Sequence, residues 1–262
     1  MYDLSALEAS LADSIYASKL HYTPVTGSTN TDALSAARSA APHGSVYFTD
    51  EQTAGRGRGD HIWLSAPAQG VYVSVLLRPA LAASLLPLLP LAAGLAAAEA
   101  IRTATGLAVD LRWPNDLLIG ERKTGGILAE AQTEKKSGEI MVSYAVIGIG
   151  INVHQSRFDP GLATPATSLD LESGRCISRQ ELLVALLESL ERESSLLLNS
   201  AGAKAIPARV EQASAWVRGR RVEVHGPQAC IGTTEGLDEN GFLLVRTVEG
   251  VTRVQTGGIR AV

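Results

Sequence analysis

The sequence predicts an α+β fold, in which a mixed central β-sheet carries helices on one face. Three features support this prediction. Residues 71–77 and 140–153 are rich in β-branched side chains that favour strands, whereas the apolar stretch 81–98 repeats leucine at helical spacing. After Ala213 the composition changes to short β-like runs. Runs of strands combined with runs of helices are typical of the α+β class.

The first part of the chain mixes helical and extended segments. The expected elements are a helix at 4–18, a strand at 21–28, a helix at 29–40, strands at 45–49 and 71–77, and a helix that ends near Thr105 and Gly106. Ser28 or Thr29 stands where a cap is expected for the helix at 29–40. We expect the helix before Thr105 to begin at prolines and to cover the sheet, because proline is tolerated in a first helical turn.

The second part of the chain ends in a separate β-rich segment. Strands are expected at 107–113, 126–132 and 140–153, and a helix at 182–198. Residues 178–181 match a capping box for that helix. We expect a main domain over residues 1–213 and a small all-β domain over 214–262. The runs of the small domain are 221–225, 229–235, 242–246 and 252–255, separated by turns such as 238–241.

The composition excludes some functional classes. Hydrophobic residues make up 45% and charged residues 19% of the chain, which is ordinary for a globular protein with a sizeable core. The formal net charge is -4, and nonspecific nucleic-acid binding needs a clustered cationic surface instead. We therefore do not expect nucleic-acid binding to be the main function.

Cysteine usage and the apolar segments indicate a cytoplasmic protein. Cys176 and Cys230 lie far apart, without CxxC or zinc-ligand spacing, so we expect buried or half-buried thiols in a reducing cytosol. The N-terminus lacks the basic and apolar regions of a signal peptide. The stretch 81–98 contains Pro87 and Pro90 and much alanine, so we expect a helix on the sheet and no membrane span.

The glycine–arginine loop at residues 55–59 is the first candidate site. Its sequence, Gly-Arg-Gly-Arg-Gly, is neither a Walker loop nor the dinucleotide-binding GxGxxG. In an extended loop Arg56 and Arg58 point the same way, and the glycines leave backbone N–H groups open. Such groups bind phosphate or carboxylate. A flexible surface loop or an RNA-binding patch of the RGG type is the alternative interpretation.

The second candidate site combines residues 113–116, Trp-Pro-Asn-Asp, with Lys123. Asn115 and Asp116 offer polar groups at a strand end, although a simple turn has the same composition. Two anions 4 Å apart repel by about 4 kcal/mol at an effective dielectric near 20, and a lysine between them removes that repulsion. Lys123 therefore suits a reaction in which a carboxylate attacks a phosphate. A solvated lysine in the turn 120–123 is the alternative.

Two further patterns are weaker. Ser28, Thr29 and Asn30 are three short hydrogen-bonding residues, which helix capping would also explain. Residues 148–152, Gly-Ile-Gly-Ile-Asn, form a strand whose glycines permit close approach and which ends in Asn152. The five histidines show no metal-ligand spacing, and the sequence indicates no Ser/His/Asp or Cys/His pairing.

In this order, the motifs resemble those of the biotin–protein ligases. The resemblance extends over nearly the whole chain: Ser-Thr-Asn at 28–30, Gln-Thr-Ala-Gly-Arg-Gly-Arg at 52–58 with Trp63, Trp-Pro-Asn-Asp at 113–116, Lys123 through Gly-Gly-Ile-Leu, and Gly-Ile-Gly-Ile-Asn at 148–152. Each motif is weak or moderate alone, but five in this order and spacing are specific. The resemblance implies a catalytic fold like that of class II synthetases, followed by a small SH3-like β-barrel.

The resemblance also implies roles for individual residues. Biotin would contact Ser28, Thr29, Asn30, Gln52, Arg56, Gly57, Arg58, Lys123, Gly125 and Gly126. ATP and the adenylate would contact Arg56, Arg58, Trp63, Asn115, Asp116, Lys123 and Asn152. Catalysis would depend on Lys123, Arg58 and Asp116, and Asp116 would also bind Mg²⁺. Trp63 would pack near the adenine, and Asn152 would hydrogen-bond it.

The implied reaction has two steps. The carboxylate of biotin attacks the α-phosphate of ATP, in the presence of Mg²⁺, and gives biotinyl-5′-adenylate and pyrophosphate. A lysine of a biotin carboxyl carrier protein then attacks the mixed anhydride and gives an amide and AMP. Positioning, charge stabilisation and a closing loop would drive the chemistry. The alternatives are a lipoate or octanoyl ligase of the same superfold and a non-catalytic sensor of biotin or a nucleotide.

The chain departs from the family pattern in two places. Asp60 and His61 stand where the family usually has a further Gly-Arg pair, and Arg112 replaces the usual lysine before Trp-Pro-Asn-Asp. Residues 1–20 precede the first expected strand, too few for the DNA-binding domain of the repressor members. We therefore expect a monomeric or homodimeric ligase that does not bind DNA or a membrane.

Overall fold

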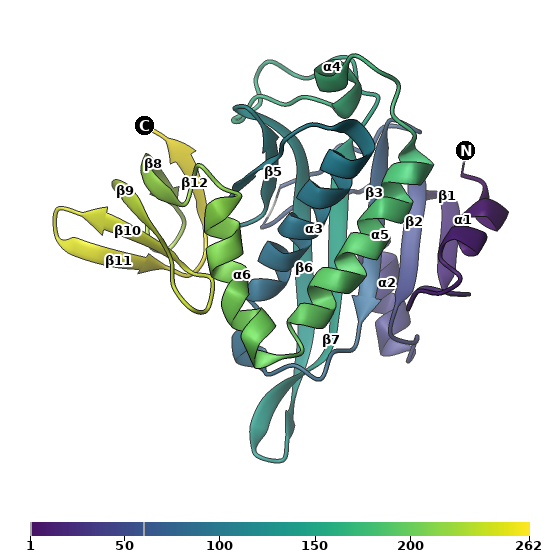
Figure 1. The fold of residues 1–262 in the computed structure, drawn as a ribbon, viewed down its shortest axis with the longest axis horizontal. Coiled ribbons are helices and arrows are strands. Elements are labelled where there is room, and N and C mark those ends of the chain that lie inside the picture. Colours follow the sequence, from purple (N-terminus) through teal and green to yellow (C-terminus); the bar gives the residue numbers. More distant parts are fainter. Residues whose placement is uncertain (1, 60) are drawn as a thin grey trace.

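The structure contains two β-sheets, and long helices cover the larger one (Figure 1). The structure is a computed structural model and describes residues 2–59 and 61–262. The elements of the N-terminal part are α1 (Leu4–Ser10), β1 (Leu20–Thr26), α2 (Thr29–Arg38), β2 (Ser45–Gln52), β3 (Gly70–Leu77), the 3-10 helix η1 (Ala83–Leu85), α3 (Leu88–Thr105), β4 (Asp110–Arg112), β5 (Asp116–Ile119), β6 (Arg122–Lys136) and β7 (Glu139–Asn152). They are followed by α4 (Leu169–Ser173), α5 (Arg179–Leu196), α6 (Ser200–Gln212), β8 (Arg218–His225), β9 (Cys230–Leu237), β10 (Leu243–Thr247), β11 (Gly250–Val254) and β12 (Gly258–Ala261).

The first sheet is mixed, as the sequence predicts. Its seven strands run in the order β1-β2-β3-β7-β6-β5-β4. β1 and β2 are parallel, whereas β2–β3, β3–β7, β7–β6, β6–β5 and β5–β4 are antiparallel. The long hairpin of β6 and β7 lies in the middle of this order, so the start of β6 and the end of β7 lie together at one end of the sheet.

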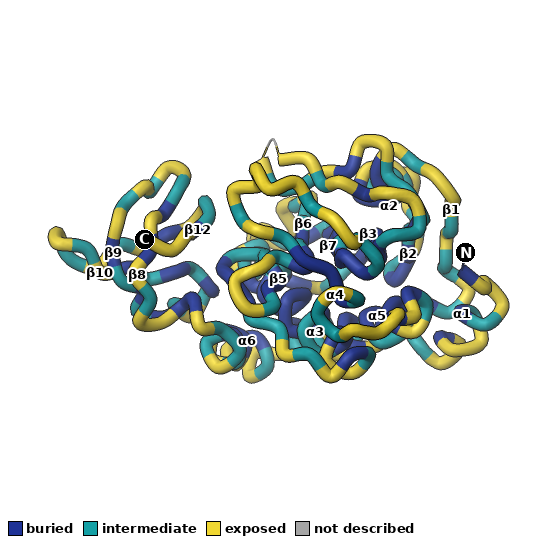
Figure 2. Tube along the Cα trace, turned by 90° about the horizontal axis from the view of Figure 1, so that it is seen from above, coloured by how far each residue is buried: buried dark blue, intermediate teal, exposed yellow. Residues whose placement is uncertain are grey.

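Helices pack on both faces of this sheet. The long helices α3 and α5 lie side by side on one face and form the main core with it (Figure 1). The burial view in Figure 2 shows buried segments between these helices and the sheet. On the opposite face, α2 packs Ala33 and Ala37 against Leu76 and Val146 in a small separate cluster. The sequence predicted helices on one face of the sheet, and α3 and α5 are those helices. The sequence did not predict that α2 packs on the other face.

Most of the apolar stretch 81–98 lies in the helix α3. Its N-cap position is Pro87, and it ends at Gly106, whose φ of 78° is readily accessible only to glycine. Most of its side chains are buried, which explains why the sequence is apolar on every side. No helix within the described residues has the length and apolar character required to span a bilayer.

Several predicted boundaries were wrong. The helix expected at 4–18 ends at Ser10, and the strand expected at 107–113 is confined to Asp110–Arg112. Ser28 occupies the N-cap position of α2, but its side chain makes no capping hydrogen bond. The sequence analysis also did not predict β5, α4, α6 and β12. The cap at Ser178 was predicted correctly, because its side chain accepts a hydrogen bond from the backbone N–H of Glu181.

The second sheet belongs to the C-terminal segment. Its five strands are antiparallel, in the order β11-β10-β9-β8-β12, and they form a separate lobe (Figure 1). The indole N–H of Trp113 donates to the carbonyl of Gly241 at 3.0 Å and so joins the lobe to the first sheet. Of the two cysteines, Cys230 is half-buried as expected, whereas Cys176 is exposed, which corrects the prediction of a buried or half-buried thiol.

Candidate functional site

The candidate site residues gather at one end of the first sheet. β2 ends at Gln52 and β7 ends at Asn152, whereas β5 begins at Asp116. Strand pairing brings Gly126 opposite both Asp116 and Gly150. Segments that are far apart in the sequence therefore contribute to a single surface.

A network of short polar side chains forms one wall of the site. The backbone N–H and hydroxyl of Thr29 donate to Gln52 Oε1 at 3.0 and 3.1 Å. The amide nitrogen of Gln52 donates to Ser65 Oγ at 2.7 Å, and Ser74 Oγ lies 2.8 Å from Thr29 Oγ1. Thr29 is 4% exposed and Ser74 is fully buried, so these hydrogen bonds hold the side chains in one arrangement.

Asn30 extends this network towards the glycine–arginine loop. Its Oδ1 accepts from Ser74 Oγ at 2.5 Å, and its Nδ2 donates to Glu130 Oε2 at 2.9 Å. The same Glu130 oxygen pairs with Arg56 at 2.6 Å. Gly148 makes room for Asn30, because a Cβ at Gly148 would lie 1.9 Å from Asn30 Oδ1. Position 148 of β7 therefore requires glycine, because any larger residue would clash with the side chain of Asn30.

A floor of bare backbone lies beside this wall. Gly126 and Gly150 pair across β6 and β7, and the indole ring of Trp63 lies directly on them. A Cβ at Gly150 would come within 2.5 Å of Trp63 Cε2, and one at Gly126 would lie 3.4 Å from Trp63 Cζ3. The buried indole N–H of Trp63 finds no hydrogen-bond partner among residues 2–59 and 61–262. An unpaired buried donor is costly, so a partner supplied by a ligand would stabilise it.

Lys123 lies at the edge of this floor. Its Nζ lies 2.5 Å from Asp116 Oδ1 and 5.7 Å from the centroid of the Trp63 ring. The second oxygen of Asp116 pairs with Arg112 at 2.6 Å. Burial raises the pKa of Asp116, but the charges of Lys123 and Arg112 outweigh it and hold that pKa below the ordinary value. Asp116 is therefore an anion that orients two cations.

Arg58 adds a third cation to this charged group. Its guanidinium donates to the carbonyl of Gly257 at 2.7 Å and to Asn115 Oδ1 at 3.4 Å. Burial lowers the pKa of Arg58, and the nearby Asp116 partly offsets this effect. With Lys123 and Arg112, three cations surround one carboxylate. The net positive charge favours an anionic ligand at this end of the sheet.

The side-chain amides of Asn115 and Asn152 donate hydrogen bonds to backbone carbonyls. Asn115 Nδ2 donates to the carbonyl of Ile127 at 2.8 Å, and Asn152 Nδ2 donates to that of Thr167 at 3.0 Å. The backbone N–H of Thr167 in turn donates to the carbonyl of Lys123 at 2.9 Å. Asn152 is thus connected to Lys123 through a segment that follows β7.

Comparison with known proteins identifies the family. Residues 22–152 match the model of the Biotin/lipoate A/B protein ligase family. The chain is 33% identical to the bifunctional ligase/repressor BirA of Bacillus spizizenii over 258 residues, which are 97% of this chain and 78% of that protein. The chain belongs to the Biotin/lipoate A/B protein ligase family.

Two other members of this ligase family are similar over most of their length. The biotin--[acetyl-CoA-carboxylase] ligase of Mycobacterium tuberculosis is 33% identical, with 89% of this chain and 85% of that protein covered. The solved biotin protein ligase from Aquifex aeolicus in complex with biotin and ATP has a TM-score of 0.79 and 29% identity, and covers 94% of this chain and 100% of that one. The fold expected for a biotin–protein ligase is therefore confirmed.

In this family member, most of the predicted site residues lie at the same end of the sheet. Thr29, Asn30 and Gln52 share one hydrogen-bond network, and Asp116 and Lys123 form an ion pair. Gly57 lies in the loop, where its N–H donates to the carbonyl of His61 at 2.7 Å, and a Cβ at Gly125 would lie 2.8 Å from the carbonyl oxygen of Gly150. Ser28 is buried beside Thr29. The predicted departure at Asp60 lies outside the described residues.

The sequence did not reveal every contributor to this ligase-family site. Ser65, Ser74 and Glu130 connect predicted residues, and Thr167 and Gly257 hold others through carbonyl groups. Single serines and backbone carbonyls have no local sequence pattern. Their contribution depends on contacts between residues far apart in the chain.

Proposed function

We propose that this chain uses ATP to activate biotin as biotinyl-5′-adenylate and transfers the biotinyl group to a lysine of a biotin carboxyl carrier protein. Family membership and the similarity to biotin ligases along nearly the whole chain support the proposal. The observation that carries it is the Lys123 ammonium, which lies within a net cationic group beside Gly126 and the Trp63 ring.

In the first step, the biotin carboxylate attacks the α-phosphorus of ATP. A new O–P bond forms, the bond to the bridging oxygen breaks, and pyrophosphate leaves. Lys123 would lie between the two anions and oppose a repulsion of about 4 kcal/mol at 4 Å. Asp116 would orient the ammonium, because the carboxylate already holds it at 2.5 Å.

The wall and the floor would position the substrates. Thr29, Asn30 and Gln52, together with Ser28, would face the ring system of biotin, and the backbone at Gly125 and Gly126 would line the same pocket. Trp63 would pack against the adenine, and Asn152 would hydrogen-bond it while Asn115 supports the nucleotide. The rigid hydrogen bonds among these side chains support the proposal, because ordered groups lose little entropy when a ligand binds.

The glycine–arginine loop would shield the reaction. Arg56 pairs with Glu130, and Arg58 donates to the carbonyl of Gly257. These contacts place both guanidinium groups near the site. When they contact the adenylate, they would offset its charge and retain it until the acceptor lysine arrives. In the second step the amine nitrogen attacks the carbonyl carbon of the anhydride, AMP leaves, and a proton is lost from nitrogen.

Asp116 does not suit a resident Mg²⁺ ion. One carboxylate oxygen lies 2.5 Å from Lys123 and the other 2.6 Å from Arg112, so both face a cation. A divalent ion there would meet strong repulsion from both groups. We therefore assign Mg²⁺ to the ATP substrate, on its phosphates, and assign Asp116 an orienting role.

The lipoate alternative shares the family model but has less support. The relative from Mycobacterium tuberculosis, which is 33% identical, is a biotin--[acetyl-CoA-carboxylase] ligase, and the similar structure from Aquifex aeolicus is a biotin protein ligase.

We further propose that residues 1–213 and 214–262 are the two domains, because α6 ends at Gln212 and the second sheet starts at Arg218. A cytoplasmic location is proposed because the substrates of the reaction, ATP and a carrier protein, are found there.

The decisive experiment is biotin-dependent exchange of labelled pyrophosphate into ATP by the purified protein. We expect exchange with biotin and much slower exchange when lipoate or octanoate replaces it. A carrier domain added with ATP and biotin should then gain one biotinyl group. Exchange that is faster with lipoate, or that is independent of any acid, would contradict the proposal.

A further inference from the structure

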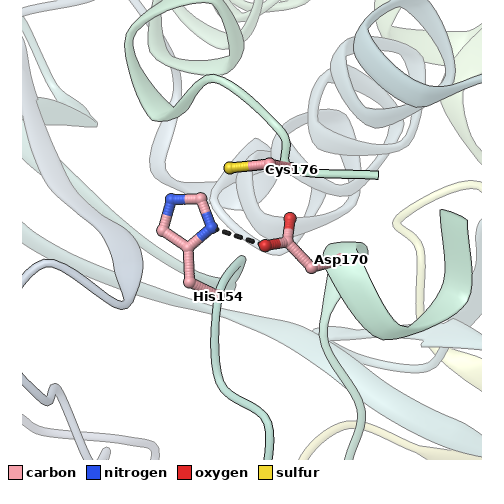
Figure 3. A group of neighbouring side chains, drawn as sticks. All are labelled: His154, Asp170 and Cys176. Atoms are coloured by element: carbon pink, nitrogen blue, oxygen red, sulfur yellow. Dashed lines mark hydrogen bonds and ion pairs between the residues drawn. The ribbon is translucent and has the colours of Figure 1, made fainter. Parts of the chain in front are cut away.

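A second group of reactive side chains lies outside the ligase site. His154, Asp170 and Cys176 each offer one ligand atom, and these atoms all lie within 4.8 Å of one another. His154 Nδ1 is 2.8 Å from Asp170 Oδ2. Figure 3 shows the sulfur of Cys176 on the same side as this imidazole–carboxylate pair. None of the three contributes to the ligase chemistry described above.

The fold brings these side chains together from three segments. His154 follows β7, and its backbone N–H donates to the carbonyl of Gln69 at 2.7 Å. Asp170 lies in α4, and its N–H donates to the carbonyl of Val153 at 3.0 Å. The backbone hydrogen bonds fix two of the three positions before any ligand is considered.

Cys176 is brought back to the pair by the end of α4. Gly174 terminates that helix with a φ of 67°, a left-handed conformation that favours glycine and lets the chain reverse. The backbone N–H of Ile177 then donates to Asp170 Oδ1 at 2.9 Å. One oxygen of Asp170 therefore holds the segment that carries Cys176, while the other faces His154.

The chemistry of the three ligands selects the metal. We propose that His154, Asp170 and Cys176 bind a zinc ion, with a water molecule in the fourth position. Thiolate and imidazole favour Zn²⁺ over Mg²⁺ or Ca²⁺, which prefer oxygen ligands. Three protein ligands and one open position are a common coordination for zinc.

The distances permit this coordination after a small adjustment. Zinc–ligand bonds of about 2.0 to 2.3 Å in a tetrahedron separate the ligand atoms by roughly 3.4 Å. The nitrogen and oxygen of His154 and Asp170, now 2.8 Å apart, must separate by a few tenths of an ångström. The sulfur of Cys176 lies within 4.8 Å of the other two ligand atoms and must move closer to them. Cys176 is exposed, so solvent leaves room for its side chain to approach by a change of rotamer.

Access from solvent is open. The side chains of His154 and Asp170 are 25% and 26% exposed, and Cys176 is exposed. A zinc ion can therefore reach all three ligand atoms from solvent.

The position of the site gives the ion a structural consequence. The segment between β7 and α4 pairs Thr167 with the backbone of Lys123 and with the side chain of Asn152. Asp170 lies in α4, three residues after Thr167. A zinc ion would tie α4 to His154, two residues after the end of β7, and so hold the strand that carries Asn152.

The test is metal binding by the full chain without biotin or ATP, so its result is independent of the proposed ligase reaction. Titration with Co²⁺, a spectroscopic substitute for Zn²⁺, should produce a thiolate-to-cobalt charge-transfer band and the visible bands of a tetrahedral ion. One equivalent of Zn²⁺ should abolish both. Calorimetric titration with Zn²⁺ should give a stoichiometry of one.

Matched variants assign the site. Cys176→Ser should remove the charge-transfer band and weaken Zn²⁺ binding by at least about tenfold, and His154→Asn should weaken it similarly. Cys230→Ser replaces the other thiol and should leave both signals unchanged. The proposal is overturned if no charge-transfer band forms, or if Cys230→Ser removes it while Cys176→Ser does not. Far-ultraviolet circular dichroism of each variant confirms that loss of the band is not loss of the fold.

Discussion

Replacing Lys123 with alanine removes the ammonium that the proposed mechanism places between two anions. At 4 Å the repulsion between the biotin carboxylate and the α-phosphate is about 4 kcal/mol at an effective dielectric near 20. Because each 1.36 kcal/mol corresponds to a tenfold change in rate, the variant should form the adenylate roughly a thousandfold more slowly. Biotin binding should weaken less, since Thr29 and Gln52 remain in place.

The fold should tolerate this change. Asp116 keeps its contact with Arg112 at 2.6 Å, and the Lys123 side chain is 28% exposed. We therefore expect the free energy of unfolding to fall by only about 1 kcal/mol. Urea denaturation of the variant and the parent measures this difference and separates a folding defect from a catalytic one.

The assay is biotin-dependent pyrophosphate exchange, with biotin binding followed by calorimetry. Lys136→Ala is the matched control, because Lys136 is exposed at the far end of the same strand, opposite Glu139. It should exchange pyrophosphate at the rate of the parent. If Lys123→Ala did so as well, the bridging role and the reasoning from charge repulsion would both be refuted.

Three further substitutions and one control test the surrounding structure. In Asp116→Asn the free energy of unfolding should fall by about 2 to 3 kcal/mol at pH 6, because two cations lose a mostly buried partner. The folded pKa of Asp116 lies below its ordinary value, so its contribution is present above about pH 4 and disappears as the pH falls through the folded pKa. Urea titrations at pH 6 and pH 3 should show the difference from the parent shrinking, and a constant difference would contradict the assignment. Gly148→Ala should destabilise the protein by about 1 to 3 kcal/mol, because its Cβ would lie 1.9 Å from Asn30 Oδ1. Gly258→Ala, whose Cβ would meet no atom within 4 Å, should be close to neutral in the same denaturation experiment. Arg58→Gly should release labelled adenylate about tenfold faster in rapid gel filtration, because the loop loses a charged hydrogen bond, whereas an unchanged release rate would remove the shielding role.

The strands with regular patterns were the most predictable parts of the fold. The β-branched content of β3 and β7 is a local feature of the sequence, and both strands were found close to their expected bounds. β5 has only four residues and follows a proline turn, so local patterns do not distinguish it from a loop. For the same reason the next strand was expected to begin at Gly126, whereas β6 begins at Arg122 and includes Lys123. Its strand partners are Leu118 of β5 and Ala166.

The candidate site shows the same division between local and distant information. Motifs placed Thr29, Asp116 and Lys123 in one region, because each lies in a distinctive stretch of sequence. The sequence did not predict that Lys123 contacts Asp116, nor that Ser74 lies beside Thr29, 45 residues away. Such contacts depend on strand register, which is a property of the assembled sheet.

The contact between Arg58 and the carbonyl of Gly257 has a practical consequence for handling the protein. Gly257 directly precedes β12, which pairs with β8 at one edge of the second sheet. A purification tag fused after Val262 begins only a few residues beyond this carbonyl and could pull β12 out of register. Preparations for kinetics are therefore better tagged before Tyr2, where α1 lies at the other side of the molecule (Figure 1).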